Sequence, residues 1–392
     1  MVDFDLPEPE ISPMLSRPYY DFRDVIAAPA RALSAKQIFV MTLFLCLSLI
    51  VYNIFTYLSY IVDGQGISVV YRAYGLLPFG LPSLAHGASF IVYGVGLALT
   101  VLVGMLGFFA VSAINIEQMR GNRFMSWRQA TRFAFKRFGQ IFLSELAVVA
   151  FVAFIIFLLF LFGLVTRIPA VGDWLYTILF ALPNFIIALF TVFIIFVLTL
   201  SVILLPAVAA AERHGESFGV IVETFSTIIR QPFRWAGYTV YSAVAAKICS
   251  FIYAYFTFRA VQFLVWSSKL GGGERLEQIT KAGLSHLPVN SDIVRETFNI
   301  FPGIDWHFSL GFISMGGRHD AVSYLMAVMI FLIFASIIGY AFAIVAAGQA
   351  YGFAAIRKIK DDYDIAAEDS LFFTEEHVNP EIGETGKDED AD

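Results

Sequence analysis

Six long apolar segments dominate the pattern of hydrophobic and polar positions along this chain. They lie near residues 37–62, 86–114, 140–165, 174–211, 237–267 and 321–352. Each is long enough to cross a bilayer core of about 30 Å as a helix. The segments are continuous and do not alternate over about ten residues, which argues against a β-barrel. The pattern therefore predicts an all-α, polytopic helical membrane protein with about six transmembrane helices.

The fourth apolar segment, 174–211, is too long for one straight span. It contains Pro183 and Pro206. Proline lacks the backbone N–H that a helix uses, and its ring clashes with the preceding turn. We therefore expect these prolines to kink or end the helix. At the first span, Ser34 and Gln37 have the spacing of a capping box, which predicts that a helix starts there.

The polar segment 117–139, EQMRGNRFMSWRQATRFAFKRFG, has a helical period of its own. The residues on its apolar face are Trp127, Thr131, Ala134, Phe135 and Phe138. The bases on the opposite side are Arg128, Arg132 and Lys136. Ser126 and Gln129 form a second capping-box pattern, so the helix is expected to begin at Trp127. A short helix that is basic, aromatic and amphipathic is typical of one lying in the plane of the membrane.

A second segment, GESFGVIVETFSTIIRQPFRW from Gly215, repeats this pattern 94 residues after Gly121. The positions equivalent to the first apolar face are Ile221, Phe225, Ile228, Ile229 and Pro232. Its bases are Arg230 and Arg234. Each segment follows one span and precedes another in the same orientation. The sequence therefore predicts a parallel internal repeat of span, in-plane helix and span, and not an inverted repeat.

The net charge of −6 conceals a basic centre between two acidic ends. Residues 361–392 hold thirteen acids and one lysine, and residues 1–16 hold four acids and no base. The remaining residues, 17–360, carry a net charge of +10. Most bases outside the spans fall on the side that holds both termini, which is the cytoplasmic side by the positive-inside rule. Both termini are therefore predicted to be cytoplasmic.

These patterns divide the chain into three parts. Residues 1–36 form an acidic and then basic amphipathic cytoplasmic arm, without the basic start of a cleavable signal peptide. Residues 37–352 form the six-span membrane domain, which includes a long extracytoplasmic loop at 269–320. Residues 353–392 form an acidic cytoplasmic tail that is expected to be disordered.

The basic sides of the two in-plane helices point to a negatively charged partner. Like charges four residues apart repel in an isolated helix, and an anionic lipid surface contributes on the order of 1 kcal/mol per base. The predicted headgroup ligands are Arg128, Arg132, Lys136, Arg230 and Arg234. The alternative is that these bases only fix the topology. A membrane-protein partner or a homo-oligomer also stays open, and no nucleic acid is expected.

Two ionisable residues lie inside predicted spans, where charge is costly and often functional. Glu145 is in the third span and Lys247 is in the fifth. They are candidates for a structural ion pair between these spans. The alternatives are a transport or ligand site, or two separate side chains that reach toward the interface.

Small residues mark positions where helices approach one another closely. In the second span these include Gly94 and Gly104, and in the sixth span Gly348 and Gly352 form a GxxxG pair. Packing within the chain is the simpler interpretation, and a homo-oligomer face is the alternative.

No catalytic motif is present in the sequence. It lacks GxSxG, HExxH, CxxC and phosphate-loop patterns, and its two cysteines, Cys46 and Cys249, both lie in apolar segments. A disulfide framework, a metal site, a cofactor and an enzymatic activity are therefore not expected.

The stretch LLPAVAAAERHGESFGVIVETFSTIIR, residues 204–230, ends a span with Leu-Pro, continues through a Glu and a Gly, and enters the second amphipathic helix. In this order, and in having an upstream copy, it resembles the multi-helix membrane domain fused to bacterial glycerophosphodiester phosphodiesterases and related six-helix inner-membrane proteins. The resemblance implies a membrane domain without catalytic activity of its own, in a bacterial cytoplasmic membrane.

The favoured function is a non-catalytic integral membrane scaffold or accessory subunit, anchored by its in-plane helices to anionic lipid or to a larger membrane complex. The alternative is a transporter or channel with a polar path near Glu145 and Lys247. A dry, closed bundle is expected in the first case, and a water-filled cavity that reaches Lys247 in the second.

Overall fold

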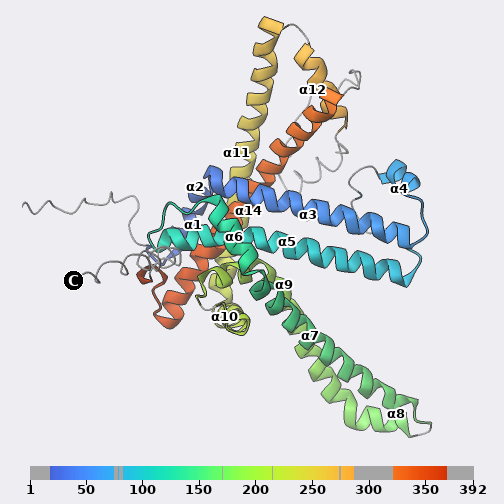
Figure 1. Ribbon diagram of the computed structural model, residues 1–392. Coiled ribbons are helices and arrows are strands. Elements are labelled where there is room, and N and C mark those ends of the chain that lie inside the picture. Colours follow the sequence, from blue (N-terminus) through green and yellow to red (C-terminus); the bar gives the residue numbers. More distant parts are fainter. Residues whose placement is uncertain are drawn as a thin grey trace, which may run out of the picture. The chain divides into compact units, whose positions relative to one another are not determined.

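The computed structural model is built of helices, with no strand among the residues that it describes (Figure 1). These residues are 18–74, 78, 83–169, 171–213, 215–272, 275–286 and 321–368. Six of the described helical segments are long and apolar enough to cross a membrane. The predicted all-α, polytopic class is confirmed, and the architecture is that of an integral membrane protein.

The six candidate spans follow the predicted apolar segments. They are α3 (Ala35–Val62), α5 (Gly87–Met119), α7 (Phe138–Gly163) with η2 (Leu164–Arg167), the segment Gly172–Ala211, α11 (Pro232–Gly272) and α14 (Ala321–Asp361). The shorter described helices are α1 (Phe22–Ile26), α2 (Ala28–Ala32), α4 (Ile67–Tyr74), α6 (Trp127–Lys136), α10 (Ser217–Arg230), α12 (Arg275–His286) and η4 (Ile365–Ala367). The two segments predicted to lie in the membrane plane are thus separate helices, α6 and α10, each placed between two spans.

The fourth span runs on through α8 (Gly172–Leu175), a π-helical turn η3 (Tyr176–Phe180) and α9 (Ala181–Ala211). Neither proline ends the helix, because Pro206 lies inside α9 and Pro183 lies in its first turn, while the alternative that they kink it stays a prediction. The π turn just before Pro183 shifts the backbone hydrogen-bond register, and α9 starts after it. The N–H that Pro183 lacks therefore falls in the first turn of α9, where proline is tolerated.

The last helix is longer than the apolar pattern predicts. α14 continues to Asp361, and η4 follows it with the buried residue Ile365. The chain is therefore still helical at residue 353, where the predicted tail begins. The basic and acidic residues at the end of α14 lower the local hydropathy, so the apolar pattern stops before the helix does. These residues are nevertheless compatible with helical structure.

The N-terminal arm and the long loop are only partly described. Residues 1–17, 287–320 and 369–392 lie outside the described residues. α3 begins at Ala35 with Ser34 as its N-cap, as expected, but Ser34 makes no side-chain capping hydrogen bond. The predicted capping box is therefore wrong at this position.

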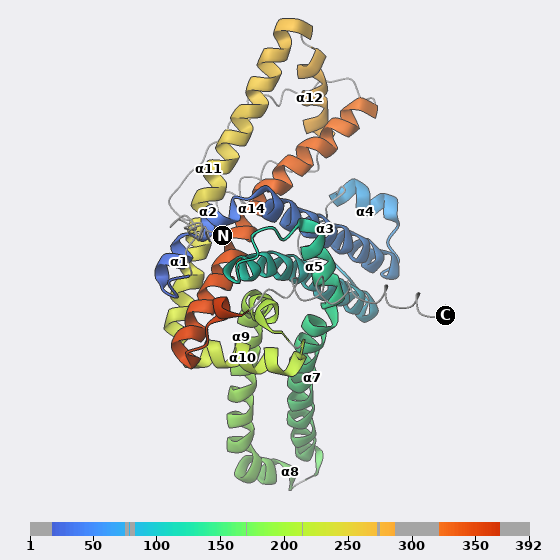
Figure 2. The same cartoon turned by 60° about the vertical axis from the view of Figure 1, so that its left-hand side comes forward.

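The described helices separate into two compact units. Unit 1 comprises residues 1–31, 108–243 and 345–392, and unit 2 comprises residues 32–107 and 244–344. In unit 1, α7 and α9 lie side by side as an antiparallel pair, with α10 across their ends (Figures 1 and 2). The buried side chains that hold this pair together, called here the hairpin cluster, are Val148, Val152, Ile155 and Ile194.

In unit 2, Asp63 joins the end of α3 to the start of α5. Its carboxylate accepts hydrogen bonds from the backbone N–H groups of Ala85 and His86, both at 2.9 Å, and from the Ser89 hydroxyl at 3.0 Å. The first N–H groups of a helix have no partner within it, so a carboxylate is well placed there. The hydrogen bond from the His86 backbone is the largest cause that holds the pKa of Asp63 well below its usual range.

Candidate functional site

Helix α6 starts where the capping pattern predicts. The Ser126 hydroxyl accepts a hydrogen bond from the Gln129 N–H at 3.2 Å, and the Gln129 side chain accepts one from the Ser126 N–H at 2.8 Å. The predicted capping box and the helix start at Trp127 are confirmed. Two backbone donors of the first turn are thereby satisfied, which stabilises this short helix.

The buried side of α6 differs from the predicted apolar face. Its buried residues are Ala130, Phe133 and Ala134. Trp127 and Phe135, which the period places on the apolar face, are exposed. The Phe133 ring stacks on that of Phe109 in α5, with 5.3 Å between ring centroids. Periodicity shows where apolar residues fall along a helix, but contact with the neighbouring helix decides which of them are buried. α6 approaches α5 through Ala130, Ala134 and the ring of Phe133.

The basic side of α6 is exposed. Arg128, Arg132 and Lys136 all have exposed side chains, and the Arg128 guanidinium lies 5.3 Å from the centre of the Trp127 ring. At about 100° per residue, α6 has a buried sector, then an aromatic sector with Trp127 and Phe135, and then the basic sector.

Helix α10 buries positions that correspond to those of α6. Its buried residues are Val220, Thr224, Thr227 and Ile228, of which the last three lie 94 residues after the buried residues of α6. Gly121 and Gly215, which are also 94 residues apart, precede the two helices and both have positive φ, of 92° and 72°. Glycine adopts this conformation without a steric penalty. The two segments thus share a turn geometry and a buried side.

The second apolar side of α10 is packed, whereas the equivalent side of α6 is exposed. Ile221 and Phe225 pack against the hairpin cluster of α7 and α9. On another side, the Lys360 ammonium of α14 donates to the Glu223 carboxylate at 2.8 Å and to the Ser226 hydroxyl at 3.1 Å. α10 is therefore held by the spans around it.

Of the two predicted headgroup ligands at or just after the end of α10, Arg234 lines an open groove. Arg230 and Arg234 are both exposed. The groove has a volume of about 470 Å³ and is lined by Phe22, Gln231, Phe233, Arg234, Gly237 and Tyr238. The ring of Phe22, from α1, stacks on Tyr238 with 5.8 Å between ring centroids, so α1 forms one wall.

A buried arginine at the end of α5, Arg120, joins three parts of unit 1. The Arg120 guanidinium is fully buried; it pairs with Glu117 at 3.2 Å and with Glu368. It also donates to the Ala211 carbonyl at 3.0 Å. A buried guanidinium is tolerated only when its charge is paired and its donors are bonded. These partners come from α5, from the C-terminal segment and from the end of α9.

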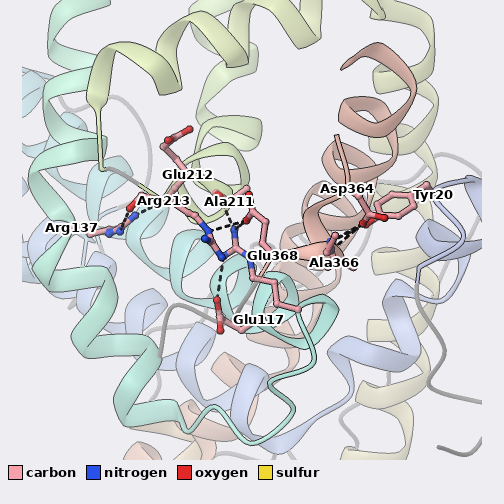
Figure 3. A network of polar contacts seen from close by, with 11 residues as sticks. Tyr20, Glu117, Arg137, Ala211, Glu212, Arg213, Asp364, Ala366 and Glu368 are labelled. Carbon is pink, nitrogen blue, oxygen red and sulfur yellow. Dashed lines mark hydrogen bonds and ion pairs between the residues drawn. The ribbon is translucent and has the colours of Figure 1, made fainter. Parts of the chain in front are cut away.

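Two further arginines complete the arrangement in Figure 3. Arg213 Nε lies 3.3 Å from the Glu368 oxygen that Arg120 also contacts. Arg137 donates to the carbonyls of Glu212, at 2.5 Å, and Arg213, at 2.6 Å. The last carbonyls of a helix lack partners within it and carry partial negative charge, so arginines stabilise the end of α9. The arginine cluster is defined here as Glu117, Arg120, Arg137, Arg213 and Glu368.

The C-terminal segment 362–368 has its own contacts beside Glu368. The Tyr20 hydroxyl donates to the Asp364 carboxylate, and the Ala366 N–H donates to the Tyr20 oxygen at 3.0 Å. The hydrogen bond from Tyr20 holds the pKa of Asp364 below its usual value. Burial, and then the hydrogen bond to Asp364, raise the pKa of Tyr20. At neutral pH the carboxylate is therefore charged and the phenol is neutral, as this hydrogen bond requires.

The two predicted intramembrane ionisable residues belong to different units. Glu145 of α7 accepts a hydrogen bond from the Ser201 hydroxyl of α9 at 3.2 Å. Lys247 lies on α11 in unit 2. The ion pair predicted between them stays a prediction. Further along α7, Val148 and Val152 belong to the apolar hairpin cluster.

The GxxxG pair of α14 packs within the chain. Gly348 lies against Ser242 of α11, and a Cβ added at Gly352 would come within 3.1 Å of the Tyr238 ring. This side of α14 is therefore covered by α11, as in the simpler of the two interpretations of the pair.

The predicted packing glycines of α5 differ from each other. A Cβ added at Gly104 would lie 3.6 Å from the Ser48 hydroxyl of α3, which is an ordinary contact. One added at Gly94 would meet no described atom within 4 Å, so the packing role predicted there is not found. A closer approach to α3 occurs at Gly107, where an added Cβ would lie 2.8 Å from that of Phe44.

The sequence patterns do not predict the arginine cluster. Glu117 and Arg120 have an i,i+3 spacing that favours an ion pair on a helix, and this signal is available in the sequence. Glu368 is 248 residues from Arg120 and lies within a generally acidic stretch, so nothing local distinguishes it. Long-range pairing of this kind requires the fold.

Within the described part of the chain, no group of three or more His, Cys, Asp or Glu residues could hold a metal ion. The chain matches no protein-family model, no curated protein and no solved structure. The site therefore has to be interpreted from its own residues.

Proposed function

We propose that this chain is a non-catalytic scaffold or accessory subunit of a bacterial cytoplasmic membrane, with both termini in the cytoplasm. α6 and α10 lie in the plane of the cytoplasmic leaflet. α6 binds anionic headgroups through Arg128, Arg132 and Lys136, and Arg230 and Arg234 add to this surface after α10. The observation that carries the proposal is the order of the three sectors around α6.

That order suits a helix at a membrane surface. A buried sector holds α6 against α5, the neighbouring aromatic sector meets the acyl boundary, and the basic sector faces the headgroups. Trp127, in the aromatic sector, fits the preference of tryptophan for the membrane–water interface. Three bases near an anionic surface contribute about 3 kcal/mol in total at low salt, which is enough to select anionic lipids.

The proposal includes a parallel repeat, α5–α6–α7 followed by α9–α10–α11. The equivalent glycines with positive φ and the equivalent buried positions support it. α7 begins at Phe138 and α11 begins at Pro232, which are also 94 residues apart. Two copies in the same orientation place both in-plane helices on one leaflet, as an anchor requires.

A transport path near Glu145 and Lys247 has less support. Glu145 has a hydroxyl partner in Ser201, but the α7 and α9 side chains of the hairpin cluster beyond it are apolar. The groove described above lies beside Arg234, and neither ionisable residue lines it. The resemblance to the phosphodiesterase-associated membrane domain remains a prediction in agreement with a non-catalytic role.

Lipid selectivity of the full-length protein tests the proposal. Native mass spectrometry would compare how many phosphatidylglycerol and phosphatidylcholine molecules stay bound to the parent and to the triple variant Arg128→Gln, Arg132→Gln, Lys136→Gln. We expect the preference for phosphatidylglycerol to fall several-fold in the triple variant. The control Arg128→Lys with Arg132→Lys keeps the charge and should keep the preference. An unchanged preference in the triple variant would contradict headgroup binding by α6.

A further inference from the structure

The arginine cluster has the composition of an anion-binding site. Arg120 donates a hydrogen bond to one oxygen of Glu368, and Arg213 Nε forms an ion pair with the same oxygen at 3.3 Å. The Arg120 side chain is fully buried, and its Nε has no hydrogen-bond partner among the described residues. We infer that this is a binding site for a phosphate group, which the chain fills with its own Glu368 carboxylate.

Charge favours a phosphate over the carboxylate that is present. Arg120 pairs with both Glu117 and Glu368, and Arg213 pairs with Glu368, so the Glu368 carboxylate lies against two guanidinium groups. A phosphomonoester carries about −1.5 to −2 at neutral pH, against −1 for Glu368. Guanidinium groups bind phosphate oxygens through paired N–H donors. Such a ligand therefore matches the two arginines more fully than a single carboxylate does.

The site lies where a phosphate is available. Arg120 directly follows α5, and Arg213 comes two positions after Ala211, the last residue of α9. Helices that cross a membrane end near the headgroup layer, where lipid phosphates lie. Free phosphate in the aqueous phase is the other source of the same chemistry. This site does not involve the exposed bases of α6, so the inference stands apart from the proposed function.

The C-terminal segment is able to leave the site without opening a long helix. α14 ends at Asp361, and η4 is a single turn of three residues. Besides Glu368, the segment is held by the buried side chain of Ile365, by the bond between Tyr20 and Asp364, and by surface contacts of Asp362 and Tyr363 with the end of α14. A phosphate that competes with Glu368 therefore displaces only the short segment 362–368 from the arginines.

The test uses full-length protein in phosphatidylcholine nanodiscs and compares the parent with Glu368→Ala. The probes are inorganic phosphate in the buffer and, separately, phosphatidic acid in the nanodisc, with phosphatidylglycerol as a phosphodiester control. A ligand that binds only the folded state raises Tm. We expect one phosphomonoester probe to raise the Tm of Glu368→Ala by on the order of 2 °C and that of the parent by less. A rise with phosphatidic acid alone identifies the lipid source, and a rise with inorganic phosphate identifies the free ion.

Matched variants locate the effect. Asp362→Ala removes the same charge from the same segment, at a carboxylate that is 92% exposed and contacts Lys358 but not the arginine cluster, and it should behave like the parent. Arg213→Ala combined with Glu368→Ala should lose the rise. Glu368→Gln keeps the shape of the side chain and replaces Glu368→Ala if the latter does not fold.

The inference would be overturned by no rise in the Glu368 variant with either probe, by an equal rise in Asp362→Ala, or by a rise that survives loss of Arg213. A rise that disappears only when the α6 bases are neutralised would overturn this site while leaving the proposed function standing.

Discussion

Helices α6 and α10 follow equivalent glycines and bury equivalent positions, yet they are held in place differently. α6 depends on its own capping box and on a small buried side against α5. α10 is packed on the hairpin cluster through Phe225 and is tied to α14 through Lys360. One amphipathic pattern thus supports two arrangements, a helix with an open basic side and a helix that its neighbours hold on two sides.

Replacing the core contact of α10 should have the largest effect. Phe225→Ala removes a partly buried ring from the hairpin cluster and should lower the free energy of unfolding by about 2 kcal/mol, less than for a fully buried ring. Thr131→Ala, the equivalent change in α6, should cost less than about 0.5 kcal/mol. Unfolding in mixed micelles with increasing dodecyl sulfate would measure both. Equal losses of unfolding free energy in the two variants would show that α6 and α10 do not differ in how they are packed.

The tie between α10 and α14 should have the next largest effect. Lys360→Met removes the cation that pairs with Glu223, and the Lys360 side chain is only 5% exposed. Because a partly buried carboxylate then lacks its partner, we expect a loss of about 1.5 kcal/mol in the same unfolding assay. Adding Glu223→Gln to Lys360→Met should recover part of it. No recovery in the double variant would show that packing of the lysine stem, and not the charge pair, holds α10.

The two turn glycines should respond alike, which sharpens the proposed equivalence of the segments. Gly121→Ala and Gly215→Ala each force a side chain into positive φ, and each should cost about 1 kcal/mol. Gly139, a helical glycine of α7 with no described atom within 4 Å of an added Cβ, is the control. Gly139→Ala should be neutral or stabilising by up to about 1 kcal/mol. A cost at only one of the two turn glycines would argue against the repeat.

Removing the caps should have the smallest effect and should again separate the helices. Ser126→Ala abolishes a capping bond of α6 and should cost about 0.5–1 kcal/mol. Glu216, the N-cap of α10, makes no side-chain capping bond, so Glu216→Ala should change stability by only about 0.3 kcal/mol or less. Hydrogen exchange of the first turns of α6 and α10 would report these changes locally. Faster exchange in both helices would contradict the assignment of the cap to α6 alone.

Local sequence signals predicted the parts of this fold that local physics determines. The apolar segments placed the six candidate spans, because length and hydropathy decide whether a helix can cross a bilayer. The capping box placed the start of α6, because its two hydrogen bonds join residues three positions apart. At Ser34 the same spacing occurs without the capping bond, since the spacing permits this bond but does not enforce it.

The features that the sequence did not predict depend on distant neighbours. The buried side of α6 is selected by α5. Periodicity places Ile221 and Phe225 on an apolar face, but it does not show that the hairpin cluster of α7 and α9 is what they pack against. Glu368 reaches Arg120 across 248 positions. Within the fourth span, the π turn before Pro183 adjusts hydrogen-bond register, a property that composition does not encode. The part of the candidate site that the sequence did not predict is therefore the pairing of residues that lie far apart in the chain.

The carboxylate of Asp63 makes one end of unit 2 resistant to acid. Because its pKa lies well below the usual range, the group stays ionised when the surroundings are mildly acidic. Its contribution to stability is present above the unfolded pKa of about 3.9 and is lost only as pH falls through the lower folded value. The hydrogen bonds that join the end of α3 to the start of α5 therefore keep their charged acceptor over a wider range of acidity than an ordinary aspartate would give them.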